Sequence, residues 1–220
     1  MALSECVFNN NERRDRLCRL NQTIVEKIKN NFRATNKLSE VLNEHFSCRF
    51  QPIAVDEGKT VKENCDFFLK ALMKIQAKIE EIDSRLKEKL EPHCYQEILA
   101  MKTPSTEQWR KVHNALNGVV SVVSVIACGV LIYLIKNGII FRSIVTTVGR
   151  IAAGFLGCVV ISLLGMGIDL ICGAIEKSKL DDAIREHEKV LEEFGPASDA
   201  YYDGIMQVMA RIQVMSELQG

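Results

Sequence analysis

Apolar residues recur at helical spacing along the first part of the chain. Between about Asn11 and Phe46 they follow one another at steps of three to six residues, which predicts one face of a long amphipathic helix. The stripe consists of Leu17, Leu20, Ile24, Ile28, Phe32, Leu38 and Leu42. Gln51-Pro52 and Glu57-Gly58 then predict a break before the next helix.

The stretch from about Lys59 to Leu90 has the most regular pattern in the chain. Its apolar residues alternate steps of four and three, with mostly charged or amide side chains between them, and this spacing is typical of a coiled-coil seam. The seam consists of Val61, Cys65, Phe68, Leu72, Ile75, Ile79, Ile82 and Leu86. A seam this narrow must be buried against another helix. We expect either an antiparallel hairpin with the first stretch or a homodimeric coiled coil.

Two apolar runs occupy the middle of the chain. The first, 116–135, has twenty residues without a charge, and as a helix it would be about 30 Å long, the thickness of a bilayer's hydrocarbon core. The second, 151–168, lies between Arg150 and Asp169 and is just long enough to cross. Together they predict a central Gly-rich apolar helical hairpin, with one or two membrane crossings left open.

Small and amphipathic residues accompany these runs. Small residues at multiples of four positions would let two spans pack closely in lipid, and they are Gly149, Ala153, Gly157, Gly165 and Gly173. Residues suited to the membrane interface flank or separate the runs: Trp109, Lys136, Arg142, Arg150 and Asp169. The basic residues are expected to anchor at the interface or to contact anionic lipid headgroups. Asp169 is expected at the interface or, alternatively, in a partnered role within a span.

A polar helical pattern returns after Ile175. One stripe, Leu180, Ile184, Leu191 and Phe194, is interrupted at Gly195-Pro196, and a second follows with Tyr202, Ile205, Met209 and Ile212. The chain is therefore predicted to be all-α, with long amphipathic or coiled-coil helices on either side of the apolar hairpin. We divide it into an N-terminal helical coiled-coil region (1–111), a membrane-associated region (112–175) and a C-terminal helical region (176–220).

The formal net charge is zero, so no overall field favours nucleic acid. The charges are nevertheless unevenly placed. Residues 1–111 carry 20 Lys and Arg against 17 Asp and Glu, whereas residues 176–220 carry 5 against 10. This asymmetry indicates either two separately solvated helical faces or attraction between the two ends of the chain.

No catalytic or metal-binding motif stands out. The eight cysteines form no CxxC pair, which argues against a zinc site and a disulfide scaffold and favours a reducing compartment. The four histidines, His45, His93, His113 and His187, have no recognised metal-ligand spacing and are expected to be exposed or hydrogen-bonded helix residues. We therefore expect no enzymatic activity, no cofactor and no small-molecule substrate.

Several short segments resemble a known family. They are Met1-Ala2-Leu3-Ser4, Thr35-Asn36-Lys37-Leu38, Glu40-Val41-Leu42-Asn43, Cys48-Arg49, Lys62-Glu63-Asn64-Cys65-Asp66, Met73-Lys74-Ile75-Gln76, Lys89-Leu90-Glu91-Pro92 and Gly167-Ile168-Asp169-Leu170-Ile171. Their order and spacing are similar to those of the vertebrate single-pass membrane and coiled-coil domain-containing proteins. The resemblance implies a membrane protein with coiled-coil helices and a single crossing, and it implies no established activity.

These observations predict a membrane-anchored helical structural or interaction protein. Its expected partners are the lipid bilayer and either another helical protein or a second copy of itself, with the polar arms in the cytosol. The alternative is a soluble-to-membrane switching protein, such as an α-helical pore former or an apolipoprotein L-like factor, that shelters its Gly-rich hairpin until insertion. A fully soluble helical bundle is a third hypothesis.

Overall fold

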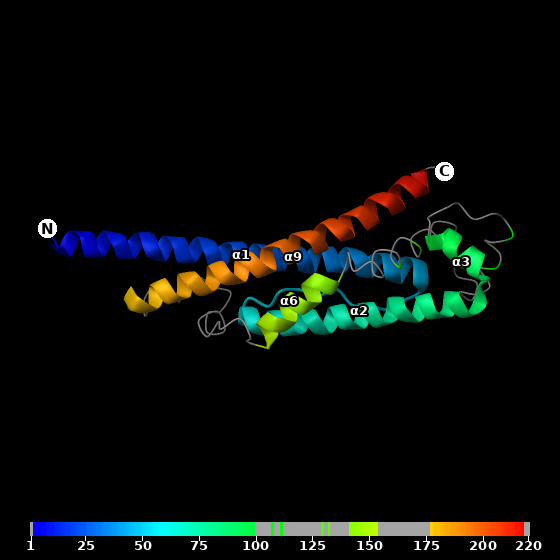
Figure 1. The fold of residues 1–220 in the computed structure, drawn as a ribbon, viewed down its shortest axis with the longest axis horizontal. Coiled ribbons are helices and arrows are strands. Elements are labelled where there is room, and N and C mark those ends of the chain that lie inside the picture. Colours follow the sequence, from blue (N-terminus) through cyan, green and yellow to red (C-terminus); the bar gives the residue numbers. More distant parts are fainter. Residues whose placement is uncertain are drawn as a thin grey trace. The chain divides into compact units, whose positions relative to one another are not determined.

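The computed structural model describes residues 2–99, 107, 111, 129, 132, 141–153 and 177–217. The regular elements in this part of the chain are α1 (Ala2–Phe46), α2 (Val61–Lys89), α3 (Pro92–Leu99), α6 (Arg142–Ala152) and α9 (Lys177–Glu217) (Figure 1). No β-strand occurs among these residues. The predicted all-α fold is therefore confirmed.

The chain forms two compact units, each built from segments distant in sequence. Unit 1 comprises Met1–Phe32, Ala54–Lys70 and Ile144–Asp199. Unit 2 comprises Arg33–Ile53, Ala71–Ser143 and Ala200–Gly220. Helices α1, α2 and α9 each contribute one part to each unit, so both units combine residues from the N-terminal and the C-terminal sequence regions.

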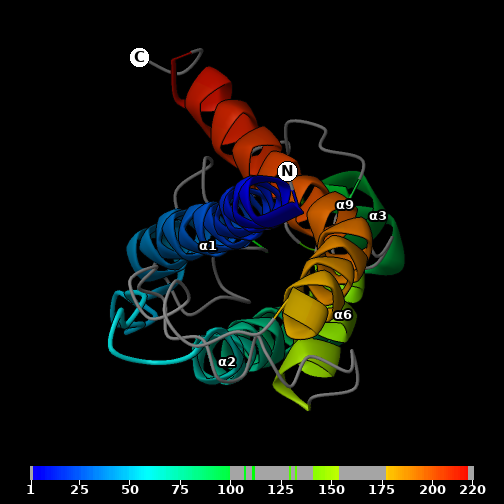
Figure 2. The ribbon, with the colours of Figure 1, turned by 90° about the vertical axis from the view of Figure 1, so that its left-hand side faces the viewer.

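In unit 1, α1 packs along α9. Leu17 belongs to an apolar cluster with Leu180, Ala183 and Ile184, and further along both helices Asn31 contacts Ser198. Because residue numbers rise together on the two helices, they run in the same direction. Figure 2 shows the two helices side by side, blue and orange.

Helices α2 and α6 complete the described part of unit 1. The ring of Phe32 on α1 stacks on that of Phe68 on α2, with centroids 4.9 Å apart. Helix α6 lies beside α2 (Figures 1 and 2), where Gly149 faces the side chain of Leu69. The buried face of α6 consists of Ile144, Thr147, Val148 and Ile151.

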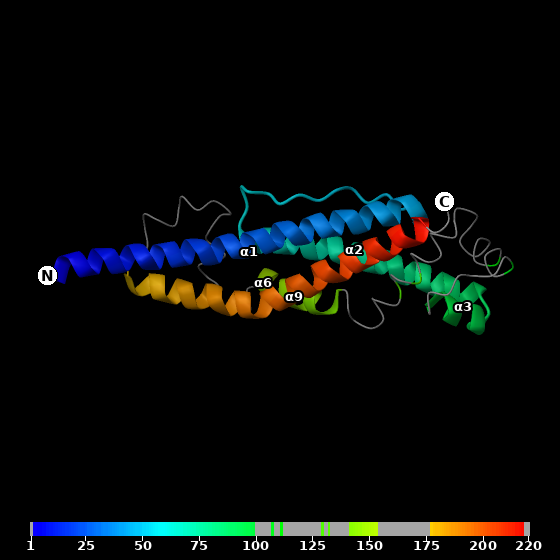
Figure 3. The same cartoon turned by 90° about the horizontal axis from the view of Figure 1, so that it is seen from above.

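The connection between α1 and α2 is extended and runs back along α1 (Figure 3). Helix α1 ends before Ser47, which adopts a left-handed conformation with φ of 51°. In unit 2, the amide of Asn43 donates to the carbonyl of Phe50 and accepts from its N–H, at 2.9 and 2.8 Å. Asn36 makes the same pair of bonds to Ile53, both at 2.8 Å. These two asparagines hold the returning chain against the helix.

The expected antiparallel hairpin of α1 and α2 is therefore wrong. Because the connection returns before α2 begins, residues 33–46 and the part of α2 after residue 70 run in the same direction within unit 2 (Figures 1 and 3). The periodicity of the two helices does not specify this direction. The connection that allows it is held by the side chains of Asn36 and Asn43, which bind its backbone.

The heptad seam of α2 is buried within the chain. Its eight side chains, from Val61 to Leu86, are 0–5% exposed. The seam is therefore covered by other parts of the same chain, although not by the expected antiparallel hairpin. An external helix is not needed to cover these residues.

Helix α9 is continuous through Pro196, although a break was expected there. The register after the proline also differs from the prediction, because Tyr201 is 1% exposed whereas Tyr202 is 38% exposed. Tyr201 lies seven residues after the buried Phe194 and four before the buried Ile205. The apolar stripe therefore continues through the proline on one helical face.

Candidate functional site

The structure describes four of the residues predicted to pack or anchor membrane spans. These are Arg142, Gly149, Arg150 and Ala153, all in or directly after α6. The others lie outside the described residues: Trp109, Lys136, Gly157, Gly165, Asp169 and Gly173. The described part of the membrane-associated region is therefore mainly the segment that joins the two apolar runs.

Helix α6 is packed against protein through the buried face that contains Ile151, and Gly149, outside that face, also meets α2. A Cβ atom at Gly149 would lie 3.8 Å from Leu69, an ordinary van der Waals contact. The guanidinium of Arg150 forms an ion pair with Glu193 of α9. Ile151, predicted as the first residue of the second apolar run, is 3% exposed. In this structure the start of that run therefore belongs to unit 1.

Phe141, directly before α6, has an unusual backbone conformation. Its φ is 72°, a left-handed value that costs a bulky residue about 1–3 kcal/mol and persists only where the surroundings enforce it. Its ring is buried, with its centroid 5.9 Å from that of Tyr201 in unit 2. Burial of this ring against α9 offsets the backbone strain.

Most of the two apolar runs lies outside the described residues. In the first run, 116–135, the structure describes Gly129 and Ile132, and both are buried. In the second, 151–168, it describes residues 151–153. Among the helices that are described, none has both the length and the apolar character that a membrane crossing requires.

Ion pairs join α1 to α9 in unit 1. Arg13 lies 2.9 Å from Asp181, Lys27 lies 2.6 Å from Asp199, and Arg16 pairs with Glu188. In each pair α1 supplies the base and α9 the acid. This agrees with the predicted attraction between the basic N-terminal and acidic C-terminal regions. Because the side chains are partly exposed, each pair contributes only about 0–1 kcal/mol and chiefly favours this register.

Polar side chains are also buried on α1 and α9. The hydroxyls of Thr35 and Tyr201 lie 2.7 Å apart in unit 2. In unit 1, Nδ1 of the buried His187 lies 2.8 Å from the carbonyl of Ala183, so it donates, while Nε2 has no partner among the described residues. Burial lowers the pKa of His187. The sequence predicts a histidine that is exposed or hydrogen-bonded. His187 is instead buried, and only one of its two ring nitrogens has a hydrogen-bond partner among the described residues.

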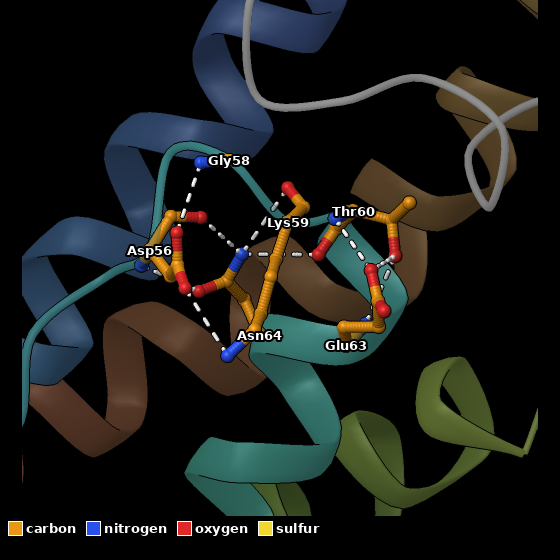
Figure 4. A network of polar contacts seen from close by, with 6 residues as sticks. All are labelled: Asp56, Gly58, Lys59, Thr60, Glu63 and Asn64. Carbon is orange, nitrogen blue, oxygen red and sulfur yellow. Dashed lines mark hydrogen bonds and ion pairs between the residues drawn. The ribbon is translucent and has the colours of Figure 1, made fainter.

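A polar network fixes the start of α2 (Figure 4). Thr60 and Glu63 form a capping box: the Thr60 N–H donates to the Glu63 carboxylate at 2.9 Å, and the Glu63 N–H donates to the Thr60 hydroxyl at 3.2 Å. The first of these bonds lowers the pKa of Glu63. Asn64, 1% exposed, exchanges two 2.9 Å bonds with the backbone of Asp56 and also donates to the Thr60 carbonyl. The network therefore holds the connection onto α2.

The described cysteines differ in their surroundings. Burial raises the pKa of Cys65 to about 12, so this seam thiol is protonated and unreactive at neutral pH. Cys94 is different, because its sulfur lies 3.7 Å from Nδ1 of His93. Together with Glu91, these two residues form the group among the described residues whose ligand atoms are close enough to hold a metal ion.

Comparison with known proteins places the chain in a family without an assigned function. Residues 13–178 match the family described as "Protein of unknown function (DUF4533)". No solved structure matches the chain. The family match covers most of the sequence, including the apolar region and the described helices α2, α3 and α6. The chain belongs to the DUF4533 family.

Proposed function

We propose that the protein is a non-enzymatic helical interaction protein anchored to a membrane through residues 112–175. The observation that carries the proposal is the contrast between the described helices and this block. The long helices turn their apolar stripes inward, and the eight seam residues of α2 are 0–5% exposed. In the same chain, residues 116–135 contain twenty successive residues without a charge, enough to cross a bilayer.

The sequence resemblance supports the same proposal. Its short matching segments extend from Met1 to Ile171 and are similar to those of the single-pass membrane and coiled-coil domain-containing proteins. We propose that the polar arms lie on the cytosolic side and that the membrane partner is the bilayer itself. A protein partner, either another helical protein or a second copy, would bind on a surface other than the α2 seam.

A specific observation favours a second candidate, the soluble-to-membrane switching protein. Ile132 in the first run and Ile151 in the second are 2% and 3% exposed. Both side chains are covered by protein in this structure, as expected for runs that are sheltered before insertion. Moving Ile151 into lipid would require the end of α6 to leave its packing in unit 1.

Carbonate washing of membranes from cells that express the full chain tests the anchor. We expect the protein to stay in the membrane pellet. The variant Val125→Arg places a charge at the middle of the first run, which disfavours insertion by about 2.5–3.5 kcal/mol, and we expect it in the supernatant. Met73→Arg is the matched control, because Met73 is 57% exposed on α2, and it should remain in the pellet.

Recovery of the unaltered protein in the supernatant would overturn the anchor and leave the switching candidate. That candidate then predicts insertion into vesicles of phosphatidylcholine and phosphatidylserine upon a trigger such as acidification. Single-cysteine variants with the thiol at positions 18, 137 or 199, labelled with an impermeant reagent in sealed vesicles, count the crossings. Labelling of 18 and 199 from opposite sides indicates one crossing. Labelling of both from one side, with 137 from the other, indicates two.

A further inference from the structure

The start of α3 brings three metal-binding side chains together in unit 2. Glu91 directly precedes the helix, and His93 and Cys94 lie in its first turn. Their ligand atoms all lie within 4.8 Å of one another. Glu91 and His93 are exposed, whereas Cys94 is 3% exposed. The cluster therefore opens to the surface with the cysteine on its inner side.

The distance between sulfur and nitrogen fits one metal ion bound by both. In a tetrahedral zinc site, Zn–S of about 2.3 Å and Zn–N of about 2.1 Å put these two ligand atoms about 3.6 Å apart. Cys94 Sγ lies 3.7 Å from His93 Nδ1. The two adjacent residues thus have nearly the separation that a shared ion requires.

A second carboxylate orients the imidazole. Nε2 of His93 lies 3.4 Å from Oε1 of Glu97, one turn further along α3. This contact favours the tautomer with its proton on Nε2, which leaves the Nδ1 lone pair directed toward Cys94. Histidines that bind zinc commonly have such a carboxylate partner on the other ring nitrogen.

A lysine already neutralises the exposed ligand. Nζ of Lys111 lies 2.8 Å from Glu91 and 3.6 Å from Glu107. An incoming metal ion competes with Lys111 for Glu91, and Lys111 retains Glu107 as a partner.

We propose that Glu91, His93 and Cys94 bind Zn²⁺, with water in the fourth position. The ligand types are those that zinc prefers, and the described residues supply three of them, as in zinc sites that keep one coordination position open. Binding releases the thiol proton of Cys94 to solvent. The proposal does not depend on the membrane anchor, because it rests only on the geometry around α3.

Titration of the full, reduced protein with Co²⁺ tests the proposal. We expect a thiolate-to-cobalt charge-transfer band, with the visible spectrum of a four-coordinate ion, and loss of both on addition of Zn²⁺. His93→Gln and Cys94→Ser should each abolish the band. Glu97→Gln should weaken Co²⁺ binding at least about tenfold, since it removes the partner of the imidazole. Lys111→Met should strengthen binding, because it removes the competitor for Glu91.

Cys48→Ser is the matched control, because Cys48 is a half-buried cysteine of unit 2 outside the cluster, and it should leave the spectrum unchanged. Circular dichroism verifies that each variant is folded. Because His93 is exposed, His93→Gln should remove the metal ligand without disturbing the fold. Absence of the band in the unaltered protein, or its persistence in either His93→Gln or Cys94→Ser, overturns the assignment.

Discussion

The hydroxyl of Thr35 on α1 lies 2.7 Å from that of Tyr201 on α9, and both side chains are buried. Tyr201→Phe removes this hydrogen bond between two buried side chains, so we expect a loss of about 1–2 kcal/mol in the free energy of unfolding. Chemical denaturation measures this loss. Tyr202→Phe, at the neighbouring exposed position, should change stability by less than about 0.5 kcal/mol.

A double-mutant cycle isolates the bond itself. Thr35→Val and Tyr201→Phe combined should cost less than the sum of the two single changes, by about 1 kcal/mol, because the bond between the two hydroxyls can be lost only once. Additive costs would contradict a direct hydroxyl–hydroxyl bond.

Asn64 is expected to be the most sensitive polar residue at the start of α2. Asn64→Ala leaves the Asp56 backbone N–H and two carbonyl groups without this partner, so we expect destabilisation by about 2–3 kcal/mol. The exposed Lys62 on the same turn provides the control, and Lys62→Ala should be nearly neutral. Equal effects of the two substitutions would contradict the described network.

Much of this fold follows from apolar spacing, and some of it does not. The stripes on α1 and α2 are visible because burial repeats with the helical period. The extended connection cannot be predicted from apolar spacing. It is held by Asn36, Asn43 and Asn64, which bind backbone groups, and such asparagines do not recur at a regular spacing along the sequence. The apolar spacing also does not predict that α9 continues through Pro196. Proline disfavours a helix locally, and packing of α9 on α1 supports the helix here. Tyr201, by contrast, was predictable from its spacing to Phe194 and Ile205.

The candidate chemistry was harder to predict from sequence. Spacing alone gave no reason to join Glu91 to His93 and Cys94, because a chain break at Pro92 can direct neighbouring side chains apart. Only the start of α3 brings the three together. The polar residues buried on α1 and α9 did leave a signal, since Asn31, Thr35 and His187 occupy positions within otherwise apolar stripes.

His187 should make stability depend on mild acid. Burial lowers its folded-state pKa below its unfolded value of about 6.5. As the pH falls below about 6.5, the unfolded chain binds a proton that the folded protein excludes, so stability present at neutral pH is lost until the folded pKa is passed. His187→Gln should flatten this dependence in urea unfolding measured at a series of pH values. His93→Gln, at an exposed histidine, should preserve it.

Gly149 distinguishes packing in lipid from packing on α2. A methyl group there meets Leu69 at 3.8 Å, and alanine is favoured over glycine within a helix by about 0.5–1 kcal/mol. We therefore expect Gly149→Ala to raise the melting temperature of the purified protein. A fall in melting temperature would indicate that a neighbouring helix approaches Gly149 more closely than Leu69 does. Such a close approach is what the predicted small-residue packing of membrane spans requires.

Leu72 tests whether the seam is internal. Leu72→Ala should destabilise the fold by about 2–5 kcal/mol, because the side chain is completely buried, and it should not change the oligomeric state measured by analytical ultracentrifugation. Met73→Ala, at the exposed neighbouring position, should change neither property. Dissociation of an oligomer by Leu72→Ala would instead support the homodimeric coiled coil.

The parallel packing of α1 on α9 has a consequence for the order of folding during synthesis. Arg16 with Glu188 and Asn31 with Ser198 are contacts between residues 172 and 167 positions apart. Helix α1 is translated before α9, because it precedes α9 in the chain. Until α9 follows, the apolar stripe of α1 lacks this native cover, and such surfaces are where chaperones bind and aggregation begins. Nascent chains stalled before residue 177 should therefore be the ones that chaperones retain.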